Sequence, residues 1–285
     1  MSITAISASI PTSISTSIST STSTAITRSR KDDLAAVPAA LRSEWIKTRS
    51  LRSNPAILGL TVVVGLLLSL ILAVFVKEDP NKHVPFTIAD TFIFSTWLTT
   101  VLAIVMGILM FTSEVQHGTL ANTIAAQPAR WVTVAAKTTI AAGFGLAMGV
   151  LGMVAGFSGA VLGGLDMGDT SGMAATALWG LLLTSLAPVF GLGTGMIIRH
   201  SSAAISTALV WTLVVENLFR GFASPRISRF LPFSAANGLL DIESLSDTPE
   251  TMALRLSRVD DAILFGGYTI AALAIGTVLL YRRDN

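Results

Sequence analysis

Cysteine is absent from this chain, and its absence excludes disulfide bonds, thiol catalysis and thiolate metal sites. Charge is scarce as well: Asp, Glu, Lys and Arg make up 13% of the 285 residues, whereas soluble domains carry roughly 25%. Hydrophobic residues make up 52%, and the mean hydropathy is +0.69. This composition indicates an integral membrane protein.

Sequence motifs of catalysis are also missing. The chain has no phosphate loop of the GxxxxGK type, no HExxH metal motif and no GxSxG nucleophile elbow. Its three histidines show no paired-ligand spacing, and no basic run is interleaved with aromatic residues as in nucleic-acid-binding proteins. We therefore expect no enzymatic activity, no metal or cofactor on this chain, and no nucleic-acid partner.

Six apolar stretches are each near or above the ~20 residues that a helix needs to cross a bilayer. Because lipid offers no hydrogen-bond partners to an exposed backbone, we expect each stretch to be helical, which gives an all-α polytopic fold. The expected spans are 56–76, 91–111, 135–162, 173–198, 203–220 and 262–281.

Positive charge in the short loops indicates the orientation of these spans. Lys and Arg are concentrated before the first span, in the second and fourth connections and at the C-terminus. Both termini should therefore be cytosolic. The connection 221–261 departs from this rule, because six spans place its arginines on the outer side.

The region before the first span divides into two parts. Residues 1–33 form a Ser/Thr-rich tail of low complexity that we expect to be disordered, and residues 34–285 form the transmembrane domain. Within that domain, the basic amphipathic segment 34–53 predicts a helix lying in the plane of the lipid headgroups. A solvated linker is the alternative.

The longest polar interval between two spans on the cytosolic side is Ser113–Lys137. Ser113 can cap a helix that begins at the acidic Glu114, and Pro128 marks where that helix should stop. The pattern predicts a short helix at the membrane surface. Physics alone leaves open whether it is a plain connection or docks a cytosolic partner.

On the opposite side, residues 230–240 are apolar but too short to cross the membrane. Pro232 and Gly238 interrupt them, which indicates a re-entrant or interfacial element. The following residues 248–258 predict a short external helix, with Pro249 at its first position.

One ionisable residue lies within a span. Glu216 and Arg220, near the outer end of the fifth span, have the i,i+4 spacing that permits pairing on a helix. We favour a structural ion pair over a proton relay, because a relay needs several such groups at depth. This scarcity argues against a transporter driven by protons or sodium.

Glycine recurs along one face of the third span and again in the fourth. Such spacing permits close packing of membrane helices, either within one bundle, which is the default expectation, or at a dimer seam. The glycines are Gly145, Gly149, Gly152 and Gly156, then Gly191 and Gly195.

Three of these stretches together resemble the membrane-spanning permease subunits of type-2 ATP-binding-cassette exporters, in their actinobacterial form. Residues 41–57 are similar to the family's interfacial N-terminal helix, Ser113–Lys137 to its cytosolic coupling signature, and residues 230–240 to its re-entrant element. In the first stretch the likeness is carried by Glu44, Trp45, Lys47, Arg49 and Arg52. In the second it is carried by Glu114, His117, Gly118, Thr119, Pro128, Arg130 and Lys137.

The resemblance implies a permease of the bacterial plasma membrane that pairs with a second copy or a paralogue. ATP and Mg²⁺ would be bound by a separate ATPase subunit, which moves the coupling helix. Residues 114–127 would transmit that movement, while Arg130 and Lys137 would anchor the helix to lipid or to the partner. The alternatives are a secondary, ion-coupled transporter and a non-transporting membrane scaffold or immunity protein.

Overall fold

The computed structural model describes residues 30–50, 53–77, 87–126, 129–167, 170, 172–242, 252 and 254–283. Within these residues the regular structure is helical throughout. Six helical runs are long and apolar enough to cross a membrane, which confirms the predicted helical, multi-pass class.

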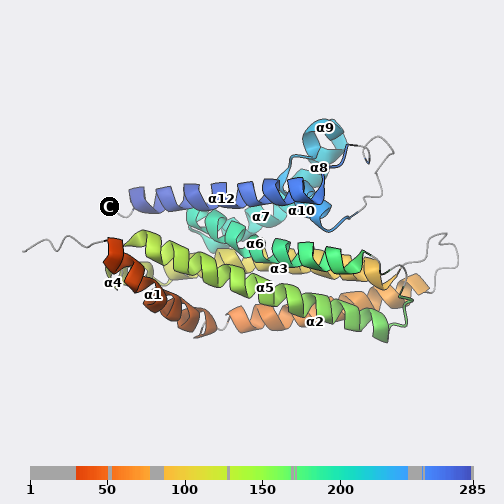
Figure 1. The fold of residues 1–285 in the computed structure, drawn as a ribbon, viewed down its shortest axis with the longest axis horizontal. Coiled ribbons are helices and arrows are strands. Elements are labelled where there is room, and N and C mark those ends of the chain that lie inside the picture. The colour runs from red at the N-terminus through yellow and green to blue at the C-terminus, as the bar shows by residue number, and fades with distance from the viewer. Residues whose placement is uncertain are drawn as a thin grey trace, which may run out of the picture.

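The six runs follow the order of the expected spans (Figure 1). The fifth is continuous but contains one π-helical turn, η1, between two α-helices. The runs are α2 (Ser53–Lys77), α3 (Ile88–Gln116), α5 (Arg130–Leu162), α6 (Met173–Ile198), α7 (Ser201–Val210) with η1 (Trp211–Val215) and α8 (Glu216–Phe222), and α12 (Arg258–Arg283).

Four shorter helices complete the described chain. They are α1 (Arg30–Ser50), α4 (Leu120–Ala126), α9 (Pro225–Ser228) and α10 (Pro232–Leu239). α1 begins before the predicted boundary at residue 34, and residues 1–29 of the predicted tail lie outside the described residues. Of the external helix predicted at 248–258, residues 248–251 and 253 lie outside the described residues, whereas residues 254–257 are described and not helical, and Arg258 begins α12.

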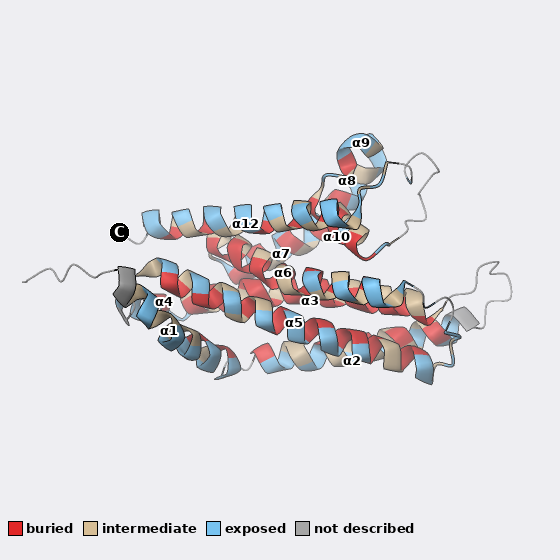
Figure 2. Cartoon of the chain, viewed as in Figure 1, coloured by how far each residue is buried: buried red, intermediate tan, exposed pale blue. Residues whose placement is uncertain are grey.

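The central layer consists of α3, α5 and α6, with α2 packed on α5 and α12 packed on α6 (Figure 1). In their most apolar windows, α3 is 61% buried and α6 is 56% buried, whereas α2, α12 and the run Ser201–Phe222 are each 22% buried. Figure 2 shows the same contrast between the centre and the peripheral helices. The peripheral helices therefore carry the apolar surface available to lipid.

The glycine-rich face of α5 packs inside this bundle. A methyl group added at Gly145 would lie 2.1 Å from the carbonyl oxygen of Thr184 on α6, and one added at Gly152 would lie 2.1 Å from Thr99 Oγ1 on α3. Such distances leave no room for a side chain, so the glycines permit backbone approach between neighbours of one chain.

The two ends of the bundle differ in composition. One end carries α1, α4 and the C-terminus, and the opposite end carries α9 and α10 (Figure 1). α10 occupies most of the apolar stretch predicted at 230–240, and its Phe233, Ala236 and Leu239 are buried against the bundle.

Candidate functional site

Four charged side chains meet at the end of the bundle that carries α1 and α4. We call them the charge cluster: Glu44 and Lys47 of α1, Glu114 of α3 and Lys137 of α5. Lys137 Nζ lies 2.7 Å from Glu44 Oε2 and 2.6 Å from Glu114 Oε1. Lys47 Nζ lies 2.7 Å from Glu44 Oε1 and 3.5 Å from Glu114 Oε1. Two ammonium groups therefore alternate with two carboxylates and join three helices.

The charge cluster is withdrawn from solvent. The side chains of Glu44, Lys137 and Glu114 are 3%, 5% and 9% exposed, and only Lys47 reaches the surface, with 37% exposure. A buried charge is costly unless it is paired and hydrogen-bonded. Each of these charges meets an opposite one, so the cost of burial is offset only while all three helices stay in place.

Burial and pairing oppose each other in the pKa values of the α1 residues. Burial by itself raises the pKa of Glu44, but the ammonium groups of Lys137 and Lys47 outweigh it and hold the pKa below its ordinary value. Burial lowers the pKa of Lys47, but the hydrogen bond to Glu44 and the field of Glu114 outweigh that effect and raise it. Both groups are charged around neutral pH.

The sequence placed these four residues in two separate motifs. Glu44 and Lys47 belonged to the interfacial helix, and Glu114 and Lys137 to the coupling signature. The structure brings the motifs together across 93 residues of sequence between Glu44 and Lys137. Lys137 was expected to anchor the helix to lipid or to a partner, and in the structure its ammonium group is buried among carboxylates of its own chain.

The helix expected to begin at Glu114 does not begin there. α3 continues to Gln116, and the hydroxyl of Ser113 donates to the carbonyl of Leu109 at 2.6 Å instead of capping a new helix. The helix of the apolar span continues through Glu114, which lies in the last turn of α3. There Lys137 neutralises the carboxylate of Glu114. Glu114 is therefore fixed to α3 and is not part of the short helix.

Gly118 makes the turn that ends α3. Its φ of 67° is left-handed, and its N–H donates to Val115 O at 3.2 Å while that of Thr119 donates to Glu114 O at 2.9 Å. This hydrogen-bond pair is the Schellman motif, which favours glycine at this position. The Gly-Thr pair of the signature thus sets the angle at which the chain leaves α3.

α4 follows directly and is attached at two points. Leu120 is buried in an apolar cluster with residues of α3, α6 and α12, namely Phe111, Leu192, Met196 and Leu280. Thr123 accepts a hydrogen bond from Lys47 Nζ at 3.1 Å, which ties α4 to α1 and to the charge cluster. Asn122 and Ala125 remain exposed.

A cavity of about 470 Å³ separates α1 from α4. Glu44, Lys47 and Thr123 line it, together with Ser43 and Asn122. The two surface helices therefore touch at the Lys47–Thr123 hydrogen bond and leave an open cavity beside it.

The remaining predicted residues at this end lie outside the charge cluster. Arg130 donates to the carbonyls of Leu280 and Tyr281 at the end of α12, at 3.3 and 3.2 Å. His117 is exposed, and its Nδ1 lies 2.7 Å from Ser113 O. Arg52 and Pro128 lie outside the described residues.

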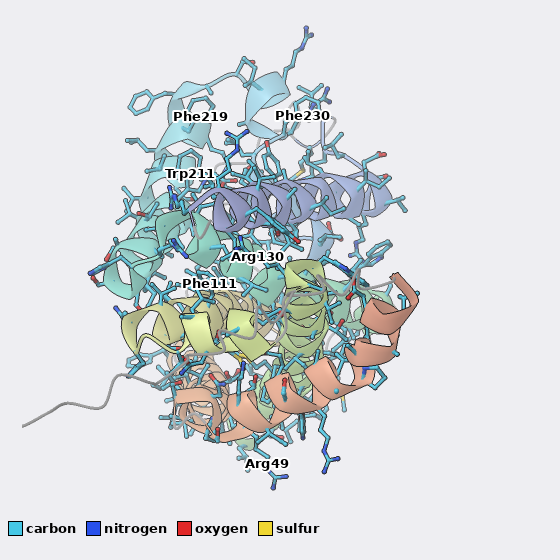
Figure 3. The ribbon with its side chains drawn as sticks, turned by 90° about the vertical axis from the view of Figure 1, so that its left-hand side faces the viewer. Arg49, Phe111, Arg130, Trp211, Phe219 and Phe230 are labelled. Atoms are coloured by element: carbon cyan, nitrogen blue, oxygen red, sulfur yellow. The ribbon has the colours of Figure 1, made fainter. Side chains whose placement is uncertain are left out.

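Trp45 and Arg49 of the predicted interfacial helix lie at the surface of the molecule. Trp45 is half-exposed, with its ring 5.4 Å from that of Phe144 on α5. Arg49 is exposed and points away from the bundle (Figure 3). α1 therefore presents a Trp and an Arg outward, residue types common at the edge of a membrane.

The two residues of the predicted ion pair, Glu216 and Arg220, each make hydrogen bonds to other groups. The carboxylate of Glu216 accepts hydrogen bonds from the backbone N–H groups of Phe233, at 3.2 Å, and Ser234 at the start of α10. Arg220 Nη2 donates instead to Asn217 Oδ1 at 2.9 Å. A helix N-terminus offers free N–H groups and a favourable dipole to a carboxylate, which explains why Glu216 turns toward α10.

The described residues contain no group of three or more His, Asp or Glu side chains placed to hold a metal ion. Comparison of the sequence with protein-family models and with curated proteins gives no match.

Proposed function

We propose that this chain is the membrane-spanning permease subunit of an ATP-binding-cassette exporter, moved by a separate ATPase subunit. One observation carries the proposal: the short surface helix α4 is connected to α1, α3 and α5 through the charge cluster. A chain without a phosphate loop needs such a connection if a nucleotide-binding partner is to move its transmembrane helices.

The route for this movement starts at the exposed face of α4. Gly118 and Thr119 join α4 to α3 by a fully hydrogen-bonded turn, so a push on α4 is passed to α3 rather than absorbed by a loose loop. Lys47 passes it to α1 and, through Glu44, to Lys137 on α5. Because the core of the bundle is closely packed, such a displacement moves whole helices.

The proposal includes the sidedness of the molecule and its partners. The end with α1 and α4 faces the cytosol of a bacterial cell, α1 lies in the headgroup layer, and α10 is the re-entrant element of the outer side. ATP and Mg²⁺ bind to the partner ATPase. The exposed apolar faces of α2, α12 and Ser201–Phe222 contact lipid and a second permease. That second permease is either a copy of this chain or a paralogue.

Photo-cross-linking from α4 tests the proposal. A p-benzoylphenylalanine at position 122 lies on the exposed face of α4, and the same residue at position 226 lies on the exposed surface of α9 at the opposite end. In native membranes, position 122 should yield a covalent product with a chain that carries a phosphate loop, and position 226 should not. Products without such a chain at position 122, or equal products at both positions, would contradict the proposal.

A further inference from the structure

A second polar site lies at the end of the bundle opposite the charge cluster. A cavity of about 420 Å³ opens where α8, α9, α10 and the beginning of α12 meet. Four arginines line it, and we call it the arginine cavity: Arg220 of α8, Arg229 after α9, Arg255 before α12 and Arg258 at its start. Among the described residues on its walls, the acidic ones are Asp241 and Asp261.

The acids neutralise only one side of the cavity. Asp241 accepts from Arg258 Nη2 at 2.9 Å and lies 3.5 Å from Arg255 Nη1. The carboxylate of Asp261 faces the backbone of Gly238, where an added methyl group would meet it at 2.0 Å. Arg255 and Arg258 are therefore held by Asp241.

Arg220 and Arg229 form the other side, and their contacts are with neutral groups. Arg220 donates to the side-chain amide of Asn217, and Arg229 Nη1 donates to the carbonyl of Leu254 at 3.3 Å. Glu216, one helical turn before Arg220, uses its carboxylate on the N-terminal amides of α10. Within the described chain, neither arginine has a carboxylate within salt-bridge distance.

Unsatisfied polar atoms concentrate in the same place. Arg220 Nε, Arg229 Nε and Asn237 Oδ1 are buried and have no hydrogen-bond partner within the described part of the chain. Leaving a buried polar group unpaired costs about 1–3 kcal/mol, and more for a charged one. Two arginines that line one cavity each have a buried Nε without a hydrogen-bond acceptor among the described residues. This indicates a ligand that supplies acceptor oxygens and negative charge.

We propose that the arginine cavity binds a phosphate group. A guanidinium presents several N–H donors in a planar arrangement that matches phosphate oxygens in two-point contacts. Two such guanidinium groups, of Arg220 and Arg229, line this cavity, which is large enough for a phosphate. The phosphate belongs either to a lipid headgroup or to a free phosphate in solution. Exposed Phe219 and Phe230 lie at the same corner of the molecule (Figure 3) and offer apolar surface to the acyl chains of a lipid.

This site accounts for a departure from the charge rule in the sequence. The connection 221–261 carries arginines although six spans place it on the outer side. Arg229, Arg255 and Arg258 of that connection line the cavity. Their positions are set by a local site rather than by membrane orientation. The inference stands apart from the ATPase, because no residue of the cavity belongs to the charge cluster or to α4.

The test uses three probes on the purified full-length chain in detergent. Phosphatidic acid and diacylglycerol share their acyl chains and differ in the phosphate, and inorganic phosphate has no chains. Native mass spectrometry should show phosphatidic acid retained and diacylglycerol not. If inorganic phosphate displaces the lipid and raises the unfolding temperature by itself, the source is free phosphate; if it does neither, the source is a lipid headgroup.

Matched variants locate the binding. Replacing Arg220 or Arg229 by Gln removes a charge-assisted contact of about 1.5–3 kcal/mol, so occupancy should fall about tenfold or more. Arg226→Gln makes the same charge change on α9 outside the cavity and should leave occupancy unchanged. Asn237→Ala provides a variant without charge loss and should weaken binding less.

Two outcomes would overturn the proposal. One is that none of the phosphate probes is retained by the folded wild-type chain. The other is that Arg226→Gln lowers retention as much as Arg220→Gln and Arg229→Gln do, which would mean that phosphate is attracted to the net charge of this end and not to the cavity.

Discussion

The two ends of this molecule use charge in opposite ways. In the charge cluster, two lysines and two glutamates from three helices neutralise one another at 2.6–3.5 Å, and all but Lys47 are nearly out of contact with water. One oxygen of this set, Glu114 Oε2, is buried without a hydrogen-bond partner in the described part of the chain, but its carboxylate is neutralised by Lys137. Among the described residues of the arginine cavity, four arginines outnumber the two acids, and two of the arginines keep buried nitrogens without a partner in that part of the chain.

The difference indicates that the charge cluster stabilises the fold and that the arginine cavity binds a ligand. A closed set of buried pairs is destabilised strongly when one member is removed, and it therefore fixes the helices that supply it. An open set of buried donors is itself unfavourable, and a ligand relieves it. The following experiments compare the two ends, beginning with the largest expected effect.

The two ends should lie on opposite sides of the membrane. Because the chain has no cysteine, Asn122→Cys on α4 and Arg226→Cys on α9 each create a single thiol at an exposed position. A membrane-impermeant maleimide should label only Arg226→Cys in intact cells, and both after permeabilisation. Labelling of Asn122→Cys in intact cells would place α4 on the outer side and end the coupling proposal.

Removing the central cation of the charge cluster should destabilise the protein severely. Lys137→Met leaves the two buried carboxylates of Glu44 and Glu114 with only the half-buried Lys47 to neutralise them, which costs about 3–5 kcal/mol. Thermal unfolding of the purified chain in detergent, followed by tryptophan fluorescence, measures the loss.

The matched control is Arg229→Met in the arginine cavity. This residue donates one hydrogen bond to a backbone carbonyl, so its loss should cost only about 1 kcal/mol. Equal destabilisation by Lys137→Met and Arg229→Met would show that the contrast between a closed and an open set of charges is mistaken.

The turn at Gly118 should have an intermediate effect on stability and a distinct effect on coupling. Ala at this position must adopt a left-handed φ of 67°, at a cost of about 1–2 kcal/mol. Since the neighbourhood is open, the strain acts on the angle between α3 and α4. In a complex with the partner ATPase, hydrolysis should continue while transport falls.

Gly143→Ala on α5 is the control for this variant. It also has open space around it but lies within a helix, where Ala is favourable. Transport that is equally affected by Gly118→Ala and Gly143→Ala would argue against a role of the turn in coupling.

The pH dependence of stability should be the smallest effect. The pKa of Glu44 is lowered from its ordinary value of 4.5, so its stabilising contribution is present above that pH and is lost as the pH falls below it. The pKa of Lys47 is raised from 10.5, so its contribution is complete below that pH and is lost as the pH rises above it.

Unfolding temperature should therefore fall as the pH drops below the first limit and as it rises above the second. Lys47→Met removes the titrating lysine and should flatten the alkaline decline while the acid decline persists. An alkaline decline of unchanged depth in Lys47→Met would assign it to other groups.

The sequence was sufficient for the parts of the fold that depend on local composition. The six spans follow from runs of apolar residues long enough to cross a bilayer, and the glycine face of α5 follows from its spacing. The structure extends α3 to Gln116 and begins α5 at Arg130, beyond the predicted limits. Helix ends depend on capping and tertiary contacts, which composition does not report.

The sequence was not sufficient for the partners of charged residues. Glu114 resembled the start of a helix because it follows a serine, but its true partner Lys137 lies on another helix. Glu216 had an arginine one turn away, yet it binds the amides of α10, which become adjacent only in the fold. Gly118 carried a readable signal, since glycine after the last turn of a helix is typical of a Schellman motif.

The position of α10 has a geometric cause in the fifth span. In the π-helical turn η1, the N–H of Glu216 bonds to the carbonyl of Trp211, five residues earlier, so one extra residue is accommodated there. A residue added to a regular α-helix rotates everything after it by about 100°, and the wider π turn absorbs that rotation locally. If the same residues were wound as a regular α-helix, everything after η1 would be rotated and the carboxylate of Glu216 would leave the amides of α10. The π turn thus sets the rotational phase on which the far end of the protein depends.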